Sequence, residues 1–340
     1  MTEQERLCAC AVPMIRFYLA NGRDLPWRRT RDPYRVLISE IMLQQTRVET
    51  VKSYYARFLS AFPTPEALAD APEEQVLKLW EGLGYYSRAR NLQKTAQAVA
   101  AGGFPRTYES LLALPGVGPY TAAAIASNCF SLPCPAVDGN VLRLCSRLLC
   151  DETPIGDRMK HRYAALLCPA YEQNDPGTLT QALMELGATL CGPGRVPDCV
   201  RCPVSSLCLA RAHEMQAQLP VRAEKAARRR EQKTVFLLRC GQALALRKRP
   251  DRGLLASLWE LPNVKGLLSE AEAAAQAAAW GVSPVELRQV VTRSHIFTHV
   301  EWEMRGISFS CAEESAGFVW ATPEDLRERL PLPTAFRQFL

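Results

Sequence analysis

Two acidic residues lie where an acid is unusual, and they are the first candidates for chemistry. Glu40 falls within the apolar run 38–43, on a predicted helix. Asp138 lies in the run 137–141, Val-Asp-Gly-Asn-Val, where another helix is predicted to begin. Each has a structural alternative, since Glu40 could form a salt bridge on its helix and Asp138 could cap a helix N-terminus. A capping role does not exclude catalysis, so the pair remains a candidate for acid–base chemistry.

Four cysteines close together form a second candidate site. They are separated by seven, two and five residues: Cys191, Cys199, Cys202 and Cys208. Four thiolates this close in sequence can hold a tetrahedral zinc ion or a cubane iron–sulfur cluster. The prolines and glycine within the segment predict a loop, which disfavours four unrelated core cysteines. By spacing alone, zinc and a cluster are both open.

The run 114–122, Leu-Pro-Gly-Val-Gly-Pro-Tyr-Thr-Ala, predicts a tight turn between two helices. Gly116 and Gly118 let the backbone approach another molecule closely, because glycine has no Cβ atom. The helix that follows presents free backbone N–H groups, which favour a phosphate. An ordinary helix–helix turn is the alternative. The run resembles the helix-hairpin-helix motif, which contacts the DNA backbone rather than reading its sequence.

Around these candidates, the apolar periodicity divides the chain into two parts. Residues 1–218 indicate successive helices, and the composition changes at Leu219-Pro220. Beyond that point strands are predicted at 234–240, 243–249, 287–293 and 298–311. A helix is predicted over 269–280, with Ser269 and Glu272 spaced as a capping box. The fold expected is a mostly α N-terminal region followed by an α+β domain of about a hundred residues.

Composition and charge limit the classes of protein that remain. The chain has 340 residues, of which 48% are hydrophobic and 22% charged, with a net charge of +6. This suits two globular domains and gives no sign of disorder. The start, MTEQERLC, has no signal-peptide pattern, and no run reaches the roughly 18 apolar residues of a membrane span. We therefore expect a cytoplasmic protein, such as one of the bacterial cytosol and nucleoid, whose 13 cysteines are not in structural disulfides.

Positive charge is concentrated between residues 222 and 233. This segment carries six basic and two acidic residues: Arg222, Lys225, Arg228, Arg229, Arg230 and Lys233 against Glu224 and Glu231. A solvated interdomain linker is the simpler interpretation, and a phosphate-binding strap is the alternative.

Taken together, the motifs resemble the adenine DNA glycosylases of the MutY type, within the endonuclease III superfamily. The resemblance covers nearly the whole chain. Its motifs are residues 25–28 (LPWR), 39–48, 82–92 (GLGYYSRARNL), the hairpin, 138–140 (DGN), 184–188 (MELGA) and the four cysteines. Several motifs in one order are more specific than any one alone.

The resemblance implies a six-helix barrel over about 28–135 and an iron–sulfur subdomain from 1–27 plus 136–218. It places a basic connector at 219–233 and a Nudix-like lesion-recognition domain at 234–340. It also implies a [4Fe–4S] cluster on the four cysteines. The first gap of seven residues departs from the six associated with the family, so zinc stays as the alternative.

The implied substrate is double-stranded DNA in which adenine is mispaired with 8-oxoguanine or G, bound by a monomer without any membrane. The adenine must leave the base stack before its glycosidic bond is attacked. By family analogy the residues around it are Trp27, Arg28, Leu43, Gln45 and Glu185. Gln45 and Tyr85 are candidates to insert into the duplex, although Trp27 and Tyr85 could simply be packed aromatics.

The same resemblance assigns the chemistry. Glu40, kept protonated by an apolar pocket, would donate a proton to N7 of adenine, and Asp138 would stabilise the oxocarbenium-like sugar with Asn140 as a polar support. In relatives that also nick the strand, a lysine occupies the place of Tyr120 and forms a Schiff base. Tyrosine cannot do this, so we expect a monofunctional enzyme.

The C-terminal part resembles the Nudix-like domain of that family. The loop of Phe297, Thr298 and His299 corresponds to its 8-oxoguanine-contacting Phe-Ser-His loop, and a β-strand with ordinary packing is the alternative. The predicted helix after Ser269 lacks the acid-rich box that Nudix hydrolases need, so nucleotide hydrolysis is disfavoured. Two rival functions stay open, namely an endonuclease III-like lyase acting on damaged pyrimidines and a non-catalytic iron–sulfur DNA-binding protein.

Overall fold

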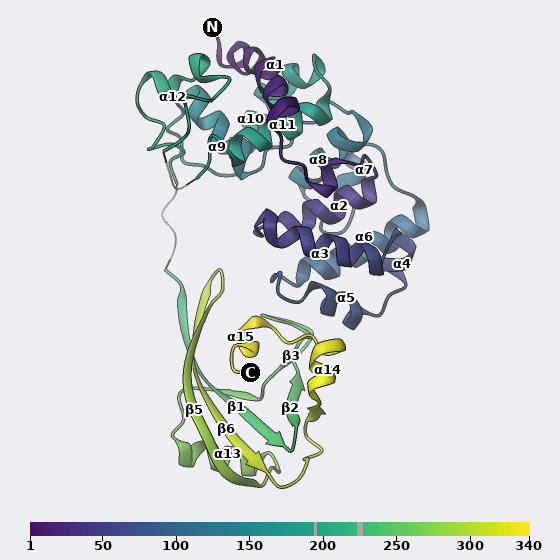
Figure 1. The fold of residues 1–340 in the computed structure, drawn as a ribbon, viewed down its shortest axis with the longest axis vertical. Coiled ribbons are helices and arrows are strands. Elements are labelled where there is room, and N and C mark those ends of the chain that lie inside the picture. Colours follow the sequence, from purple (N-terminus) through teal and green to yellow (C-terminus); the bar gives the residue numbers. More distant parts are fainter. Residues whose placement is uncertain (194–195, 223–226) are drawn as a thin grey trace. The chain divides into compact units, whose positions relative to one another are not determined.

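A computed structural model describes residues 1–193, 196–222 and 227–340 of the chain. Its contacts divide the chain into two compact units, residues 1–70 with 91–224 and residues 71–90 with 225–340. Figure 1 shows helices in the first unit and a curved sheet in the second. The predicted combination of a mostly α N-terminal region and an α+β C-terminal domain is confirmed.

The helices of the first unit are mostly short, and several of them begin after an aspartate or threonine whose side chain accepts a backbone N–H. Their bounds are α1 Glu3–Asn21, η1 Pro26–Arg28, α2 Pro33–Leu43, α3 Val48–Ala61, α4 Pro65–Ala69, α6 Ser87–Gly102, which begins in the second unit, α7 Tyr108–Leu112, α8 Pro119–Phe130, α9 Gly139–Leu149, α10 Asp157–Glu172, α11 Pro176–Ala188, η2 Ser205–Leu207 and α12 Leu209–Ala212.

The N-terminal helix and the cysteine segment share one hydrophobic core. Helix α1 packs against α9, α10 and α11 through buried residues such as Leu7 and Met14. Cys191 and Val204 belong to the same core, although they lie almost two hundred positions further along the chain. The N-terminal helix of the first unit is therefore packed beside the cysteine loop.

The second unit is built on one mixed sheet. Its strands are β1 Arg229–Cys240, β2 Ala243–Lys248, β3 Trp259–Glu260, β4 Asn263–Lys265, β5 Pro284–Ile296, β6 Val300–Cys311 and β7 Val319–Ala321. The sheet order is β3-β2-β1-β6-β5, with β4 also paired to β1 and β7 to β2. Only the β1–β6 pair is parallel among the described strands. The predicted hairpin turn is confirmed, because Cys240 pairs with Ala243 across Gly241 and Gln242.

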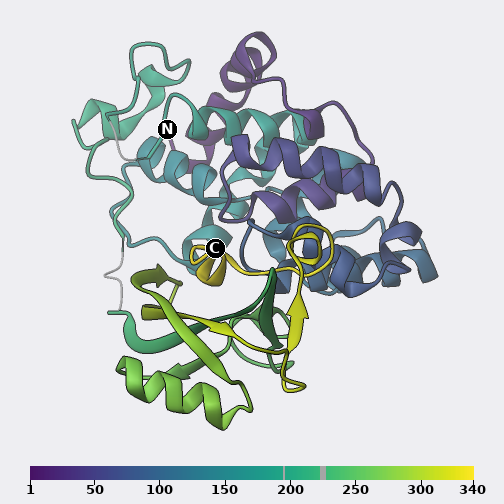
Figure 2. The same cartoon turned by 60° about the horizontal axis from the view of Figure 1, so that its bottom comes forward.

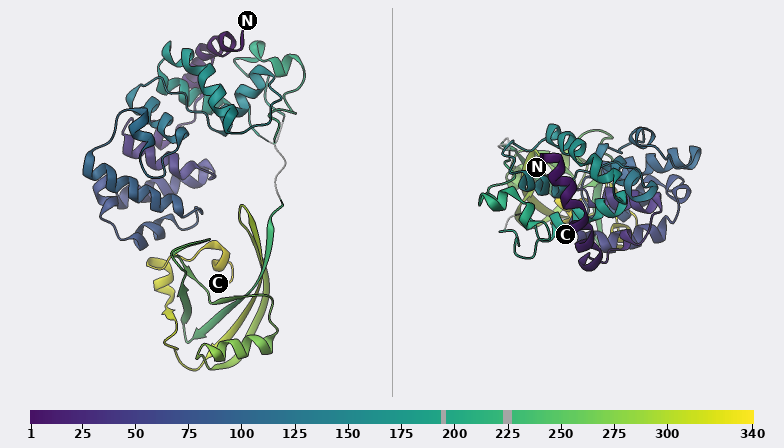
Figure 3. Two further views of the ribbon diagram at one scale, coloured as in Figure 1. Left: turned by 180° about the vertical axis from the view of Figure 1, so that it is seen from behind. Right: turned by 90° about the horizontal axis from the view of Figure 1, so that it is seen from above.

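Helices cover both faces of this sheet. Helix α13 (Glu270–Ala279) lies against one face, as Figure 2 shows. Phe236 and Phe309 are buried on this face. Helix α15 (Thr334–Arg337) lies on the other face (Figure 3). There Phe336 packs against Trp302. The capping box predicted at Ser269 is confirmed, since its hydroxyl accepts from the Glu272 backbone while the Glu272 carboxylate accepts from the Ser269 N–H.

Part of the expected basic connector is strand rather than linker. Strand β1 begins at Arg229, five residues before the predicted start, and residues 229–233 pair with the beginning of β6. The cause is the parallel partner, which supplies hydrogen bonds that no local pattern reveals. Lys233 is buried and stacks over the Trp302 ring at 4.6 Å. Glu224 and Lys225, which the sequence places in this charged segment, lie outside the described residues.

Residues 71–90 group with the second unit, although the sequence predicts them in the N-terminal barrel. Helix α5 (Glu73–Trp80) and the residues after it make the contacts: the Lys78 ammonium donates to the Leu326 carbonyl at 2.6 Å. The Glu81 carboxylate accepts from the Leu332 backbone at 2.8 Å and pairs with Arg337 at 3.1 Å.

None of the helices that the structure describes is long and apolar enough to cross a bilayer.

Candidate active site

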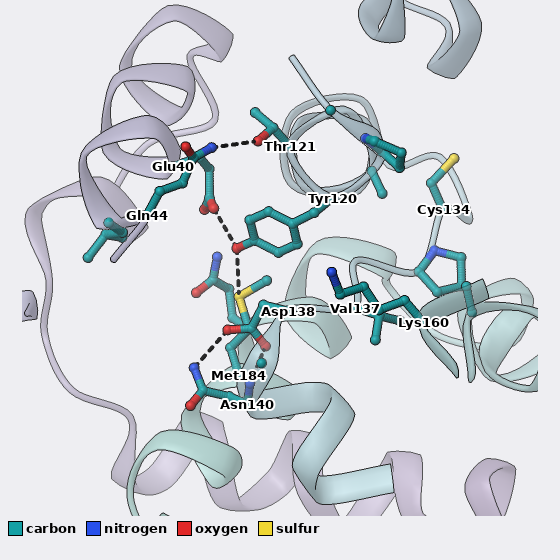
Figure 4. Close-up of a pocket in the computed structure, with 18 of the residues that line it drawn as sticks. Glu40, Gln44, Tyr120, Thr121, Cys134, Val137, Asp138, Asn140, Lys160 and Met184 are labelled. Carbon is teal, nitrogen blue, oxygen red and sulfur yellow. Dashed lines mark hydrogen bonds between the residues drawn. The ribbon is translucent and has the colours of Figure 1, made fainter. Parts of the chain in front are cut away.

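A cavity of about 1040 Å³ in the first unit collects most of the residues singled out in the sequence. The predicted residues that line it are Trp27, Arg28, Glu40, Leu43, Gln45, Gly116, Gly118, Tyr120, Asp138 and Asn140. They come from η1, α2, the turn between α2 and α3, the α7–α8 turn, and the starts of α8 and α9. Residues separated by about a hundred positions thus face one space, and Figure 4 shows the central ones.

Glu40 is the buried acid of this cavity. Its side chain projects from α2 and is 5% exposed, and its Oε2 accepts a 2.6 Å hydrogen bond from the Tyr120 hydroxyl (Figure 4). Burial raises the pKa of Glu40 to about 7, the Tyr120 hydrogen bond opposes that rise, and the nearby Asp138 adds to it. Burial first, and then the neighbouring carboxylates, raise the pKa of Tyr120 well above its ordinary value, so its hydroxyl keeps its proton and donates.

This burial has a measurable effect on stability. The pKa of Glu40 is about 7 in the folded protein against an ordinary 4.5, so the folded state holds an extra proton between these pH values. The free energy of unfolding should therefore fall as pH rises through this range, by up to about 3 kcal/mol. Glu40→Gln removes the ionisation, so its melting temperature should exceed that of the wild type at about pH 8 and approach it at about pH 5. Melting curves that differ equally at both pH values would contradict a raised pKa.

Asp138 has the predicted capping role and also faces the cavity. Its Oδ1 accepts from the backbone N–H groups of Asn140 and Val141 at 2.9 and 2.8 Å, which caps α9. Its Oδ2 accepts from the Asn140 side chain at 2.7 Å. Burial raises the pKa of Asp138, and these three donors act against the rise. The carboxylate is therefore fixed in one orientation by its own helix start.

The turn that holds Asp138 is fixed from behind by α11 and by a buried arginine. A Cβ atom at Gly187 would lie 2.8 Å from Asn140 atoms, so only glycine permits this approach. The Arg143 guanidinium donates to Oδ1 of Asn140 at 2.8 Å, to the Gly187 carbonyl at 2.7 Å and to the Cys191 carbonyl at 2.9 Å. Arg143 thus links Asn140, which holds the Asp138 carboxylate, to Cys191 at the start of the cysteine loop.

Trp27 and Arg28 form one wall, whereas Glu185 lies behind it. Trp27 is 6% exposed and packs edge-on against Tyr55, with ring centres 5.5 Å apart. Glu185 is 1% exposed, does not line the cavity, and pairs with Arg23 at 2.8 Å and Arg28 at 2.7 Å. Burial acts to raise the pKa of Glu185, but the hydrogen bonds and charges of these two arginines outweigh it. The pKa of Glu185 is therefore lowered, and the carboxylate stays ionised. Glu185 therefore holds Arg28, which itself lines the cavity.

Two further predicted residues have unusual backbones. Gln45 in the first unit has φ 61° and Tyr85 in the second has φ 48°, a left-handed conformation that is uncommon for residues other than glycine. Strain of this kind gathers at functional sites. In the hairpin, Gly116 has φ 72°, and a Cβ there would lie 2.5 Å from the Cβ of Asn91. The hairpin turn thus requires glycine both for its conformation and for its packing against α6.

The second unit has a cavity of its own, which holds the residues predicted to contact the lesion. Tyr85, Phe297, Thr298 and His299 all line it. The last three form the turn between β5 and β6, so the alternative of an ordinary strand does not hold for them. The Tyr85 hydroxyl and Thr298 Oγ1 lie 2.8 Å apart in a hydrogen bond, and Tyr85 is 49% exposed. The rim is basic, with Arg228, Arg229 and Arg249 among its lining residues.

The four cysteines line one small cavity, as a shared group would require. Cys191, Cys199, Cys202 and Cys208 all face it, from the end of α11 to the start of α12. The Arg147 guanidinium, 4% exposed, donates to Cys191 Sγ at 3.2 Å. Within the described residues no three Cys, His, Asp or Glu side chains converge as a single metal ion needs. Four thiols around a common space are the donor set of either a tetrahedral zinc ion or an iron–sulfur cluster.

Further residues of the cavity were not among the predicted site residues. The Tyr120 hydroxyl also lies 3.9 Å from Met184 Sδ, and the Gln44 amide donates to Thr121 Oγ1 at 3.4 Å (Figure 4). Arg28 Nε donates to Gln181 Oε1 at 2.8 Å. Met184 begins the 184–188 motif, which is a usable signal. Gln181 lies one helical turn before Glu185, and only the fold shows that it turns toward Arg28.

Comparisons with known proteins give matches to two family models and to curated glycosylases. Residues 38–170 match the family of HhH-GPD superfamily base excision DNA repair proteins, and residues 234–340 match the NUDIX domain. The adenine DNA glycosylase of Mus musculus is 35% identical, over 92% of this chain and 73% of the mouse protein. That of Arabidopsis thaliana is 38% identical over 84% of this chain, which spans 55% of the plant protein.

Solved structures resemble the helical part. A trapped endonuclease III–DNA covalent intermediate is 25% identical, with a TM-score of 0.54, over 63% of this chain and 99% of that one. A thermostable thymine-DNA glycosylase is 30% identical, with a TM-score of 0.53, over 62% of this chain and 98% of that one. Both alignments include nearly all of the known protein, so the similarity extends through a complete glycosylase fold.

Proposed function

The chain belongs to the family of adenine DNA glycosylases, and from this premise we propose that it hydrolyses the N-glycosidic bond of adenine mispaired with 8-oxoguanine or G in duplex DNA. The product would be an abasic site. The observation that carries the proposal is the buried Glu40, whose pKa is raised to about 7, in one cavity with Asp138. We also propose that it acts as a cytoplasmic monomer.

The geometry supports a stepwise hydrolysis. Adenine flips out of the stack into the cavity beside Trp27 and Arg28. Glu40 donates its proton to N7, which makes adenine a better leaving group, and the C1′–N9 bond breaks with its electron pair staying on the base. The fixed carboxylate of Asp138 stabilises the positive charge on the sugar. Glu40, now ionised, accepts a proton from the water that attacks C1′.

Tyr120 supports a monofunctional reaction. Its hydroxyl is engaged by Glu40 and cannot form an imine with the abasic sugar. We therefore expect borohydride to trap little protein–DNA adduct during turnover. Lys160 also lines the cavity, so Lys160→Ala is the matched control for any adduct from a lysine at the rim. A strong adduct that persists in Lys160→Ala would refute the proposed mechanism.

The four-cysteine loop is proposed to hold a [4Fe–4S] cluster. Cys191, Cys199, Cys202 and Cys208 supply its thiolates, and a bound cluster would tie together a loop that has little secondary structure of its own. The Arg147 guanidinium donates a hydrogen bond to Cys191 Sγ, one of the four sulfurs. The four cysteines line one small cavity despite the seven-residue first gap, which supports this proposal.

The cavity of the second unit is proposed to contact the 8-oxoguanine strand. Thr298 keeps the hydroxyl that a hydrogen bond to the lesion needs, and Tyr85 and Phe297 offer aromatic faces for stacking. Nudix-type hydrolysis is the weaker alternative. On α13, the Glu272 carboxylate already caps its own helix, and Glu270 lies 4.0 Å from Arg305.

Three exposed arginines allow a test of backbone binding. Arg228, Arg229 and Arg230 lie at the start of β1 or just before it. Replacing all three by Gln should flatten the slope of log affinity against log salt, by about 0.9 for each phosphate that these arginines neutralise. Binding titrations at several salt concentrations measure this. An unchanged slope would mean that these three arginines do not contact phosphates.

One panel of substrates separates the candidate functions. Single-turnover base release is measured on duplexes with A opposite 8-oxoguanine, A opposite G, and an oxidised pyrimidine. We expect adenine release from the first two, faster from the first, and none from the third. Pyrimidine release with strand cleavage would favour an endonuclease III-like lyase. No release from any duplex, with binding intact, would favour a non-catalytic DNA-binding protein.

A further inference from the structure

Two cysteines end the two neighbouring strands at the centre of the sheet. Strand β1 ends at Cys240 and β6 at Cys311. The two strands are parallel, and their register runs without a break to the pair of Arg239 and Ser310. The next pair along is therefore Cys240 and Cys311, and both are free thiols.

Their side chains lie on the same face of the sheet. Phe236 and Leu238 on β1 belong to the core beneath α13, as do Ile307 and Phe309 on β6. Side chains on a strand return to the same face every second residue, so Cys240 points to this face as Cys311 does. Neighbouring strands lie about 4.8 Å apart, within the roughly 4.4–6.8 Å between Cα atoms that a disulfide allows.

The two thiols differ in access to solvent. Cys311 is 8% exposed, and burial raises the pKa of its thiol, with a further rise from Cys240. Cys240 is partly exposed and adjoins the hairpin turn, where Gly241 is exposed. An oxidant can therefore reach Cys240 first, and Cys311 is placed as the thiol that resolves the product.

We propose that Cys240 and Cys311 form a redox-sensitive dithiol that closes to a reversible disulfide with a disulfide-class oxidant. The Cys240 thiolate attacks one sulfur of oxidised glutathione, and one glutathione thiolate leaves. The Cys311 thiolate then attacks the Cys240 sulfur, and the second glutathione leaves. Two protein thiols lose two electrons and two protons in total, and one glutathione disulfide becomes two glutathione thiols.

The bond would link the central strands of the second unit across a long stretch of chain. A disulfide that closes a long loop restricts the unfolded state more than one that closes a short loop. The oxidised protein should therefore melt at a higher temperature than the reduced protein. This inference is independent of the proposed glycosylase activity, because neither cysteine lines a cavity assigned to DNA.

Peptide mapping tests the pair directly. The full-length protein is equilibrated in glutathione buffers of rising oxidised fraction, its remaining thiols are alkylated, and it is digested with trypsin without reduction. Cleavage gives peptides 240–247 and 306–327, each with a single cysteine. We expect these two peptides linked in oxidised samples and separate after reduction.

Variants make the result decisive. Cys240→Ala and Cys311→Ala should each abolish the linked peptide and the rise in melting temperature on oxidation. Cys150→Ala, a partly exposed thiol of the first unit, should change neither. If both peptides carry the alkyl label in every buffer, or if Cys240 is found linked to another cysteine, the proposal is overturned.

Discussion

Glu40→Gln is expected to slow the release of adenine from an A:8-oxoguanine duplex by about 10²- to 10⁴-fold, the contribution typical of a general acid. Glutamine keeps the length of the side chain and an oxygen that can accept from the Tyr120 hydroxyl. It has no acidic proton to give to N7 and no carboxylate to activate water. The substitution preserves the hydrogen bond to Tyr120 but removes the acidic proton. The change in rate therefore measures the contribution of proton donation by Glu40.

The measurement is single-turnover base release with the variant in excess over duplex. Binding of the mispaired duplex should stay within a few-fold of the wild type, because Glu40 is buried. Glu49→Gln is the matched control, an exposed glutamate on α3 that pairs with Lys52. If Glu40→Gln releases adenine at the rate of that control, Glu40 is not the acid.

The pH profile gives an independent check on the same residue. Catalysis needs protonated Glu40, whose pKa of about 7 is set chiefly by burial. The single-turnover rate of the wild type should therefore fall as pH rises above about 7, approaching tenfold per pH unit. The residual rate of Glu40→Gln should lack this decline. A wild-type rate that is flat across this range would mean that another group donates the proton.

Features set by neighbouring residues could be predicted from the sequence. Asp138 is predicted to cap a helix, and it does, because the cap depends only on N–H groups two and three residues ahead. The Ser269 capping box and the β1–β2 hairpin are local for the same reason. The start of β1 is not predictable in this way, because residues 229–233 are held by a parallel partner about seventy positions later. No local pattern carries that information.

The candidate site divides in the same way. The sequence motifs supply the acids and the cysteines, but the hydrogen bond from Tyr120 to Glu40 spans 80 positions. Glu185 is predicted beside the base because it is polar and lies in a motif. The fold instead pairs it with two arginines, since a carboxylate that is 1% exposed needs charged partners. Residue type and motif could not distinguish contact with a ligand from support of a neighbour.

Asp138→Asn separates capping from catalysis at one position. Asparagine caps helices about as well as aspartate, so α9 should still begin at residue 139. The negative charge that would stabilise the oxocarbenium-like sugar is lost, and we expect adenine release to slow by about 10²- to 10³-fold, as when one stabilising group is removed elsewhere. Circular dichroism and single-turnover release measure the two effects separately.

Asp175→Asn is the matched control for that change. Asp175 caps α11 by accepting from the Thr178 backbone at 2.9 Å, so the same substitution alters a cap without touching the cavity. One difference can be anticipated: the Asp138→Asn amide would face the Asn140 amide that now donates to Oδ2, which costs one hydrogen bond. A modest loss of stability with normal excision would make Asp138 a cap alone. A large loss of excision at near-control stability would show that its charge acts on the sugar, as the orientation fixed by Asn140 and Val141 suggests.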